Sequence, residues 1–164
     1  MWLNVIEENP IWFFDATGSI HRTINRQQKP FFYSIVCHDT KKKKILPIAE
    51  FLTTSNNQYT ISRYLSEIKL RLNVSQKKNV CPQIIVTDMS WALINSIMQV
   101  FNHCSVLEYL NCCYDCILKN IQFEKIVYYT CSTHFIKNII RKAKGNLKGN
   151  KTKHFLRILI SLSF

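Results

Sequence analysis

Two aspartates each follow a short run of bulky apolar residues. Asp15 follows residues 11–14, and Asp88 follows residues 82–87. If these runs are neighbouring strands, they lie about 4.8 Å apart and the two carboxylates converge. Converging carboxylates repel each other unless a cation such as Mg²⁺ or Mn²⁺ neutralises them. The pair therefore points to metal-dependent phosphoryl transfer. The alternative is that each aspartate only caps a turn or a helix.

Cysteine and histidine supply a second constellation. Cys131-x2-His134 follows the last expected strand, and Cys113-x2-Cys116 lies upstream of it. Together the two pairs have the look of a zinc site. Cys113 and Cys116 also fall inside an expected helix, where three-residue spacing arises from a buried face, and free cysteine is a common core residue. Zinc is therefore a weaker prediction than Mg²⁺ or Mn²⁺.

The charge balance favours nucleic acid as a partner. The 164 residues include 22 Lys and Arg against 10 Asp and Glu, which gives a net charge of +12. Such a surplus repels itself unless a polyanion is near, so DNA is the expected partner. The alternatives are solvated surfaces and a compositional bias towards Lys and Asn. The candidate phosphate contacts are Lys41, Lys42, Lys43 and Lys44 in an expected turn, and Lys137, Arg141 and Lys142 in an expected helix.

Hydrophobic periodicity predicts the elements that position the two aspartates. Three strands followed by alternating helices and strands predict a mixed sheet, antiparallel first and parallel afterwards, with the first and fourth strands side by side. The continuous apolar run before Asp15 predicts a first strand buried on both faces. Pro47 places the third strand at a sheet edge. Helical spacing makes Trp91 and Tyr109 core residues before it makes them base-stacking residues. The expected strands are 11–15, 30–38, 45–53, 82–87 and 125–130, and the expected helices are 60–72, 91–101, 105–118 and 135–144.

The cysteine count and the start of the chain bear on its compartment. Seven cysteines are an odd number, and no apolar signal region opens the sequence. Reduced thiols and a nuclear or cytoplasmic, non-secreted protein are therefore expected. No apolar run reaches the length of a membrane span, so no membrane partner is expected. The sequence by itself gives no support for an oligomer.

Three blocks of sequence resemble the catalytic domain of Mutator-like element (MULE-type) transposases. FFDATG at residues 13–18 resembles the family's first-aspartate strand. IVTD at residues 85–88, followed by ALINSI at 92–97, resembles its second-aspartate strand and helix, and this block is the most specific. CSTHFIKN at residues 131–138 resembles its Cys-x2-His block. The three blocks occur in the family's order.

The resemblance implies a ribonuclease-H-like fold, a DDE-type active site, bound Mg²⁺ or Mn²⁺, and DNA strand transfer. By motif position, Asp15 and Asp88 would be the first two metal ligands and catalytic carboxylates. Cys131 and His134 would be an auxiliary pair with a structural or site-supporting role.

The chain departs from the family's pattern in two places. Segment 106–124 is longer than the family's usual gap and carries extra cysteines. The family's third acid is a glutamate downstream of the histidine, whereas nothing acidic follows Glu124. A C-terminally incomplete transposase domain is therefore expected over residues 11–145, followed by a basic loop and the start of a truncated helical segment over 146–164. Glu67, on the first expected helix, is a weak substitute for the third acid.

The expected function is that of a transposase-derived protein. It is related to metal-dependent DNA cleavage and transfer, and is expected to be inactive by itself because the third acid is missing. Three alternatives stay open: a non-catalytic nucleic-acid-binding remnant, a zinc-stabilised interaction domain, and a product without function.

Overall fold

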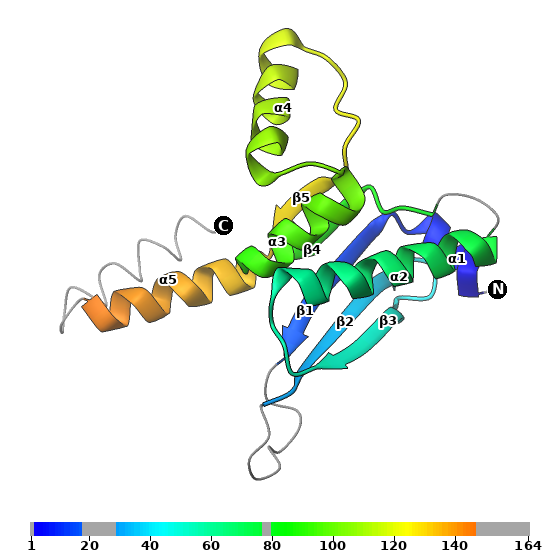
Figure 1. Cartoon of the computed structure of the whole chain (residues 1–164), viewed down its shortest axis with the longest axis horizontal. Helices are drawn as coiled ribbons and strands as arrows, with labels where there is room; N and C mark the ends of the chain where they lie inside the picture. The colour runs from blue at the N-terminus through cyan, green and yellow to red at the C-terminus, as the bar shows by residue number, and fades with distance from the viewer. Residues whose placement is uncertain (1, 18–28, 77–79, 147–164) are drawn as a thin grey trace. The chain divides into compact units, whose positions relative to one another are not determined.

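A computed structural model of the chain describes residues 2–17, 29–76 and 80–146. The chain divides into two compact units, Met1–Tyr129 and Thr130–Phe164. Figure 1 shows the helices and strands of both units with the labels used below.

The described residues form a five-stranded mixed sheet (Figure 1). The strands lie in the order β3-β2-β1-β4-β5, with β1 antiparallel to β2 and parallel to β4. This arrangement confirms the predicted mixed α/β sheet, antiparallel first and parallel afterwards, including the neighbouring first and fourth strands. The strands are β1 (Ile11–Thr17), β2 (Phe31–Asp39), β3 (Lys44–Thr53), β4 (Ile84–Thr87) and β5 (Val127–Thr130).

The hairpin of β2 and β3 forms one edge of the sheet. Its register shifts between Ile35, which pairs with Ala49, and Val36, which pairs with Pro47. The shift leaves Ile48 as the extra residue of a bulge beside the proline. Proline has no backbone N–H to donate to a neighbouring strand, so it favours an edge strand. The edge position of β3 confirms the prediction made from Pro47.

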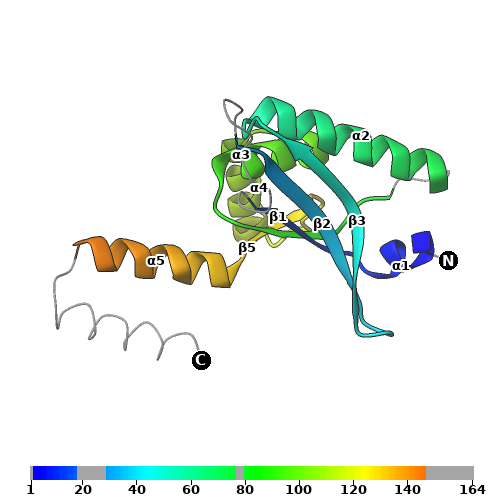
Figure 2. The ribbon, with the colours of Figure 1, turned by 90° about the horizontal axis from the view of Figure 1, so that it is seen from below.

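Helices cover one face of the sheet. Helices α2 and α3 pack against the same face of the sheet and against each other, and Figure 2 shows α2 lying along that side of the strands. The predicted helix over 91–101 forms, but its last turns widen into the π-helical segment η1. The short α1 was not predicted. The helices are α1 (Trp2–Glu8), α2 (Gln58–Gln76), α3 (Trp91–Ile97), η1 (Met98–Asn102), α4 (Val106–Lys119) and α5 (Ser132–Asn146).

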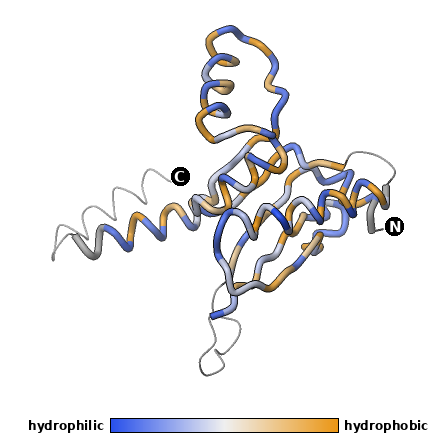
Figure 3. The backbone as a smooth tube through the Cα atoms, viewed as in Figure 1, coloured by the Kyte–Doolittle hydropathy of each residue, from blue (hydrophilic) through white to orange (hydrophobic). Residues whose placement is uncertain are grey.

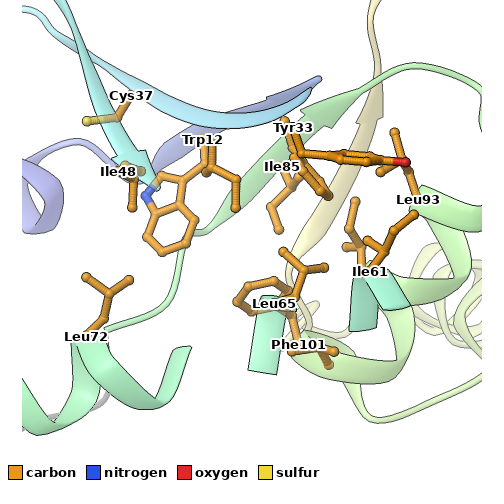
Figure 4. Packing of buried hydrophobic residues seen from close by; sticks show 14 of the residues in the cluster. Trp12, Tyr33, Cys37, Ile48, Ile61, Leu65, Leu72, Ile85, Leu93 and Phe101 are labelled. Carbon is orange, nitrogen blue, oxygen red and sulfur yellow. The ribbon is translucent and has the colours of Figure 1, made fainter. Parts of the chain in front are cut away.

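The core lies between the sheet and these helices (Figure 4). Trp12 and Phe14 of β1 are each 2% exposed, and Trp12 meets Phe101 edge-on at 6.2 Å between ring centroids. The face of α2 that the sequence predicts is buried against them, because Ile61 and Leu65 recur at helical spacing and both lie in the core. This packing fixes the position of β1 and β4 under the helices.

The prediction that β1 is buried on both faces is wrong. Ile11 and Phe13 are about 40% exposed, whereas Trp12 and Phe14 between them are buried. Side chains of a strand alternate between its two faces. In the part of the chain that the structure describes for the first unit, helices α2 and α3 pack against only one of those faces. An apolar run shows that both faces are apolar, and does not show that both are covered.

Helix α4 and the loop after it leave the sheet and return to it as β5 (Figure 1). Ser105 and Glu108 form a capping box at the start of α4, since each side chain accepts the other residue's backbone N–H. Asn120, with φ 50°, ends the helix in the left-handed conformation that asparagine tolerates. The Tyr109 ring is buried against Phe123, at 5.6 Å between centroids.

The second unit contains α5. Its first turn begins beside Cys131, whose carbonyl accepts the backbone N–H of Phe135 at 2.9 Å. The prediction for the segment from His154 onwards lies outside the described residues. Among the described helices, none combines the length and the apolar character that a membrane crossing requires.

Candidate metal-binding site

The register of β1 and β4 brings the two predicted aspartates together. The last pair of the parallel ladder is Phe14 with Thr87, and Asp15 and Asp88 are the next residues along the chain. Because side chains alternate along β1, Asp15 belongs to the face opposite Phe14, whereas Asp88 follows the end of β4. Adjacent strands are about 4.8 Å apart, so the two residues are neighbours. Asp15 lies inside β1 and not at its end as predicted, since the strand continues to Thr17.

Each carboxylate also has a local structural role. Oδ1 of Asp15 accepts the backbone N–H of Ala16 at 2.8 Å, and Oδ1 of Asp88 accepts that of Ser90 at 3.0 Å. The second bond shapes the turn that leads from β4 into α3. The turn-capping role predicted as the alternative is therefore filled by one oxygen, Oδ1, of each carboxylate. Neither Oδ2 has a hydrogen bond to the residues described here that would compete with a metal ion.

One tyrosine contacts Asp88 and a second responds to its charge. The Tyr128 hydroxyl donates to the Asp88 backbone carbonyl at 3.2 Å. The Tyr33 hydroxyl donates to Oδ1 of Asn56 at 2.6 Å. Burial, and secondly the negative charge of Asp88, raise the pKa of Tyr33 to about 12. Tyr33 therefore stays a neutral donor at neutral pH.

Asp15 opens onto an apolar groove on the uncovered face of the sheet. The groove has a volume of about 480 Å³ and is lined largely by β1 and β2, with Phe13 and Phe32 among its apolar walls. Ser34, the β2 partner of Asp15, also lines it. This side of the carboxylate is therefore open to solvent and to a ligand.

The candidate metal ligands at this edge of the sheet are the two carboxylates of Asp15 and Asp88, which are oxygen ligands. No cluster of three or more His, Cys, Asp or Glu side chains with metal-binding geometry occurs among the described residues. Two carboxylates are nevertheless a set that Mg²⁺ accepts, because that ion keeps several waters and takes further oxygens from substrate phosphates. Glu67 does not join the pair, since its carboxylate accepts Arg71 Nε at 2.7 Å on the exposed side of α2.

The predicted lysine turn lies at the other end of the sheet. Asp15 pairs with Ser34 of β2, whereas the turn of Lys41 to Lys44 follows Asp39. Asp39 is five residue steps along the strand from Ser34, which is roughly 17 Å. Lys41 is also engaged with Glu8 at 2.7 Å, an ion pair that raises the lysine pKa. The structure therefore does not bring these lysines to the two aspartates.

Trp91 was predicted as a core residue, and that prediction is wrong. Its side chain is 68% exposed at the first position of α3, three residues after Asp88, and Met89 beside it is also exposed. Tyr109, predicted on the same grounds, is buried. Hydrophobic periodicity does not distinguish the exposed Trp91 from the buried Tyr109. The first turn of a helix can extend beyond the element that covers the remaining turns of that helix. Proximity in sequence to Asp88 was the signal that could have marked Trp91.

The thiols that suggested zinc lie in different surroundings. Cys113 packs in a small cluster with Tyr109, Ile94 and Met98. Cys116 lines a separate cavity together with Cys112, one turn away. Burial and the neighbouring Cys112 thiol raise the pKa of Cys116, which disfavours the thiolate that a metal needs.

The remaining predicted residues lie in the second unit. Cys131 and His134 are half-buried around the first turn of α5. Lys137, Arg141 and Lys142 are exposed along the same helix, and Arg141 donates to Asn138 at 3.2 Å. An exposed basic row on one helix is compatible with phosphate contacts and with a solvated surface alike.

The sequence of the chain is similar to that of a transposon protein. The chain is 30% identical, over 162 residues, to the 120.7 kDa protein in the NOF-FB transposable element of Drosophila melanogaster. The matched region covers 91% of this chain and 14% of that protein, so the chain spans about one seventh of its relative. No family model matches the chain. The similarity supports a transposon derivation of the chain and leaves its chemistry open.

Proposed function

We propose that this chain is the aspartate-bearing part of a metal-dependent DNA transposase of the MULE-type DDE class. In this proposal Asp15 and Asp88 hold Mg²⁺ or Mn²⁺ at the carboxylate edge of β1 and β4. DNA is the substrate and partner, and the nucleus is the expected site of action. The parallel register that makes the two aspartates neighbours carries the proposal. The transposon similarity supports the same conclusion independently.

The ion would supply charge neutralisation and activation of the attacking oxygen at a DNA phosphate. The residues of this chain have three tasks. Asp15 and Asp88 fix the position of the ion, each through Oδ2, because Oδ1 of each accepts a backbone N–H of the following residues. Tyr128 holds the Asp88 backbone in place. Trp91 offers an exposed ring beside Asp88 on which a DNA base can stack, a contact worth about 1–3 kcal/mol.

A DDE site needs a third acid, and this sequence has no carboxylate after Glu124. Two carboxylates bind a divalent ion weakly unless phosphate oxygens complete its coordination. We therefore expect weak metal binding that DNA strengthens, and no strand cleavage by the 164 residues alone.

The test is isothermal titration of Mn²⁺ into the whole chain, with and without a short single-stranded oligonucleotide. Asp15→Asn and Asp88→Asn should each abolish the metal-dependent heat. Asp115→Asn, which changes an exposed carboxylate on α4, should leave the heat unchanged and serves as the matched control. Equal Mn²⁺ binding by the unchanged chain and all three variants would rule out the proposed site. Melting temperatures of the variants separate lost ligation from lost folding.

A second candidate is a remnant that binds nucleic acid through its basic surface without chemistry. Lys42, Lys43 and Lys44 favour it, because they are exposed and lie far from the aspartates. Fluorescence anisotropy with DNA distinguishes the two candidates. Binding that falls on replacing these lysines with glutamine, but not on Asp15→Asn or on removal of divalent ions, would favour the remnant. Metal-dependent binding that Trp91→Ala weakens would favour the transposase site.

A further inference from the structure

The connection between β3 and α2 carries a polar side chain, that of Asn56, to the end of the sheet where β1 and β4 finish. Strands β1 and β3 are both antiparallel to β2, and β4 is parallel to β1, so all three end on the same side. Residues 54–57 lie between the last residue of β3 and the start of α2. Figure 3 shows this connection in the white and blue of polar residues. The topology therefore places Asn56 at the end of the sheet that bears Asp15 and Asp88.

A hydrogen bond ties Asn56 to the core next to Asp88. The Tyr33 hydroxyl donates to Oδ1 of Asn56 at 2.6 Å. Tyr33 is fully buried, and its ring stacks on Phe51 at 4.7 Å and meets Phe14 at 6.0 Å between centroids. Phe14 lies on β1, and its ladder partner on β4 is the residue before Asp88. Burial, and secondly the charge of Asp88, raise the pKa of Tyr33, so that carboxylate acts on the hydroxyl that holds Asn56.

The bond to Tyr33 leaves the amino group of the Asn56 side chain available. Oδ1 is turned towards the phenol, which keeps its proton at neutral pH and donates it. Nδ2 of the planar amide therefore points away from Tyr33, and it donates to no group in the described part of the chain. Because Asn56 is exposed, its two N–H donors are open to a ligand.

The neighbours of Asn56 hold its backbone in place. The Ser55 N–H donates to Oγ1 of Thr53 at 3.1 Å. Nδ2 of Asn57 donates to Oγ of Ser55 at 2.7 Å, and Oδ1 of Asn57 accepts the N–H of Thr60, in the first turn of α2, at 2.8 Å. A side chain that is fixed before a ligand arrives loses little conformational freedom on binding.

We propose that Asn56 is a substrate-binding residue of the candidate metal site, and that its Nδ2 donates to a non-bridging oxygen of the DNA phosphate that coordinates the ion. This role rests on the proposed function and adds a contact for the substrate phosphate, from which the lysine turn is remote. Asparagine is a regular donor to DNA phosphates. Its amide is uncharged and does not repel a cation, and a hydrogen bond to a charged oxygen is stronger than one between neutral groups. Tyr33 acts through Asn56 as a positioning residue.

Isothermal titration of Mn²⁺ into the whole chain, with and without a short single-stranded oligonucleotide, tests this role. In Asn56→Ala the Mn²⁺ affinity without DNA should stay unchanged. The gain in affinity that DNA brings should fall about tenfold, because a hydrogen bond to a charged group contributes about that factor. Asn111→Ala, at an exposed asparagine of α4, is the matched control and should keep the gain. An unchanged gain in Asn56→Ala overturns the proposal. So does a lower Mn²⁺ affinity without DNA, which would make Asn56 a metal ligand.

Tyr33→Phe tests the positioning role, because it keeps the buried ring and removes the hydroxyl. It should lower the gain from DNA by about threefold and leave the Mn²⁺ affinity without DNA unchanged. The double variant Tyr33→Phe/Asn56→Ala should lose no more of the gain than Asn56→Ala, since the tyrosine acts through the asparagine. A tyrosine with a purely structural role would lower the melting temperature and leave the gain from DNA intact, and that result would contradict the positioning role.

The same titrations separate this proposal from the proposed function. If the unchanged chain binds no Mn²⁺, or if Asp15→Asn and Asp88→Asn retain the binding, the metal site fails and the role of Asn56 fails with it. If the two aspartate variants lose the metal ion while Asn56→Ala keeps the full gain from DNA, only the role of Asn56 fails.

Discussion

Helices α2 and α4 have the same kind of sequence and opposite surroundings. On α2, Ile61 and Leu65 recur at helical spacing and are almost completely buried against the sheet. On α4, Leu110 and Tyr114 recur at the same spacing and are exposed. Hydrophobic periodicity thus reports that a helix has an apolar face. It does not report whether the same chain covers that face, because this depends on where the loops place the helix.

The largest expected difference is in the free energy of unfolding lost on replacing each of two tryptophans, the buried Trp12 and the exposed Trp91. Trp12→Ala should lower the free energy of unfolding by about 3–5 kcal/mol or prevent folding, because it empties the core beside Phe101. Trp91→Ala should change it by less than about 0.5 kcal/mol, because the ring is 68% exposed. Urea denaturation followed by circular dichroism measures both. Equal losses would show that the exposed position of Trp91 is wrong.

A smaller effect is expected where α4 is anchored. Tyr109→Phe keeps the ring packing and removes the hydroxyl that accepts the Tyr128 N–H. The expected cost is about 1 kcal/mol, together with faster hydrogen exchange along α4 than along α2. Tyr114→Phe is the matched control, because the Tyr114 ring is exposed. Unchanged exchange in Tyr109→Phe would mean that something else holds the helix.

Loss of the capping box at the start of α4 should cost still less. Ser105→Ala removes the acceptor of the Glu108 N–H and one partner of the Glu108 carboxylate. A loss of about 0.5–1 kcal/mol is expected, again localised to α4 by hydrogen exchange. The backbone N–H of Ser105, and secondly its hydroxyl, donate to the Glu108 carboxylate and hold its pKa below its ordinary value. Ser105→Asp retains a capping oxygen and should recover most of the loss, whereas a loss shared by the sheet would contradict the local role of the cap.

The smallest effect concerns pH and links the core to the candidate site. The folded-state pKa of Tyr33 is raised to about 12 from an ordinary value of 10. A raised pKa means that the folded state favours the protonated phenol, so this contribution to stability is complete below pH 10 and is lost as the pH rises towards 12. Asp88→Asn should lower the Tyr33 pKa while burial keeps it above the ordinary value. Ultraviolet titration of the phenolate, with Tyr33→Phe identifying its signal, measures the shift. A higher pKa in Asp88→Asn would contradict the assigned cause.

Most of the sheet could be predicted because its signals are local. Apolar runs ending at Asp15 and Asp88, and a proline in the third strand, were sufficient for the strand order around β1. Helix α1 was missed because its seven residues are too short to show a helical period. Burial of Ile6 against the core holds it in place, and that contact is not visible in the local sequence.

The candidate site was predicted in part for a related reason. The sequence marked Asp15 and Asp88 because each follows a strand, but only the parallel register places them side by side. It also proposed Lys41 to Lys44 as phosphate contacts, and only the direction of β2 shows that they lie at the far end of the sheet. Cys113 and Cys116 look like a pair in the sequence, and the helix directs them to different surroundings.

The sequence by itself determined which residues are apolar, where most of the strands and helices form, and which side chains could bind a metal ion. These properties follow from side-chain chemistry and from backbone periods of two and 3.6 residues. Only the tertiary structure decided that one face of β1 is covered, that Trp91 is exposed, and that Leu110 and Tyr114 of α4 are exposed. Coverage and proximity depend on the direction in which each connection sends the next element, and contacts between residues far apart in the sequence fix that direction.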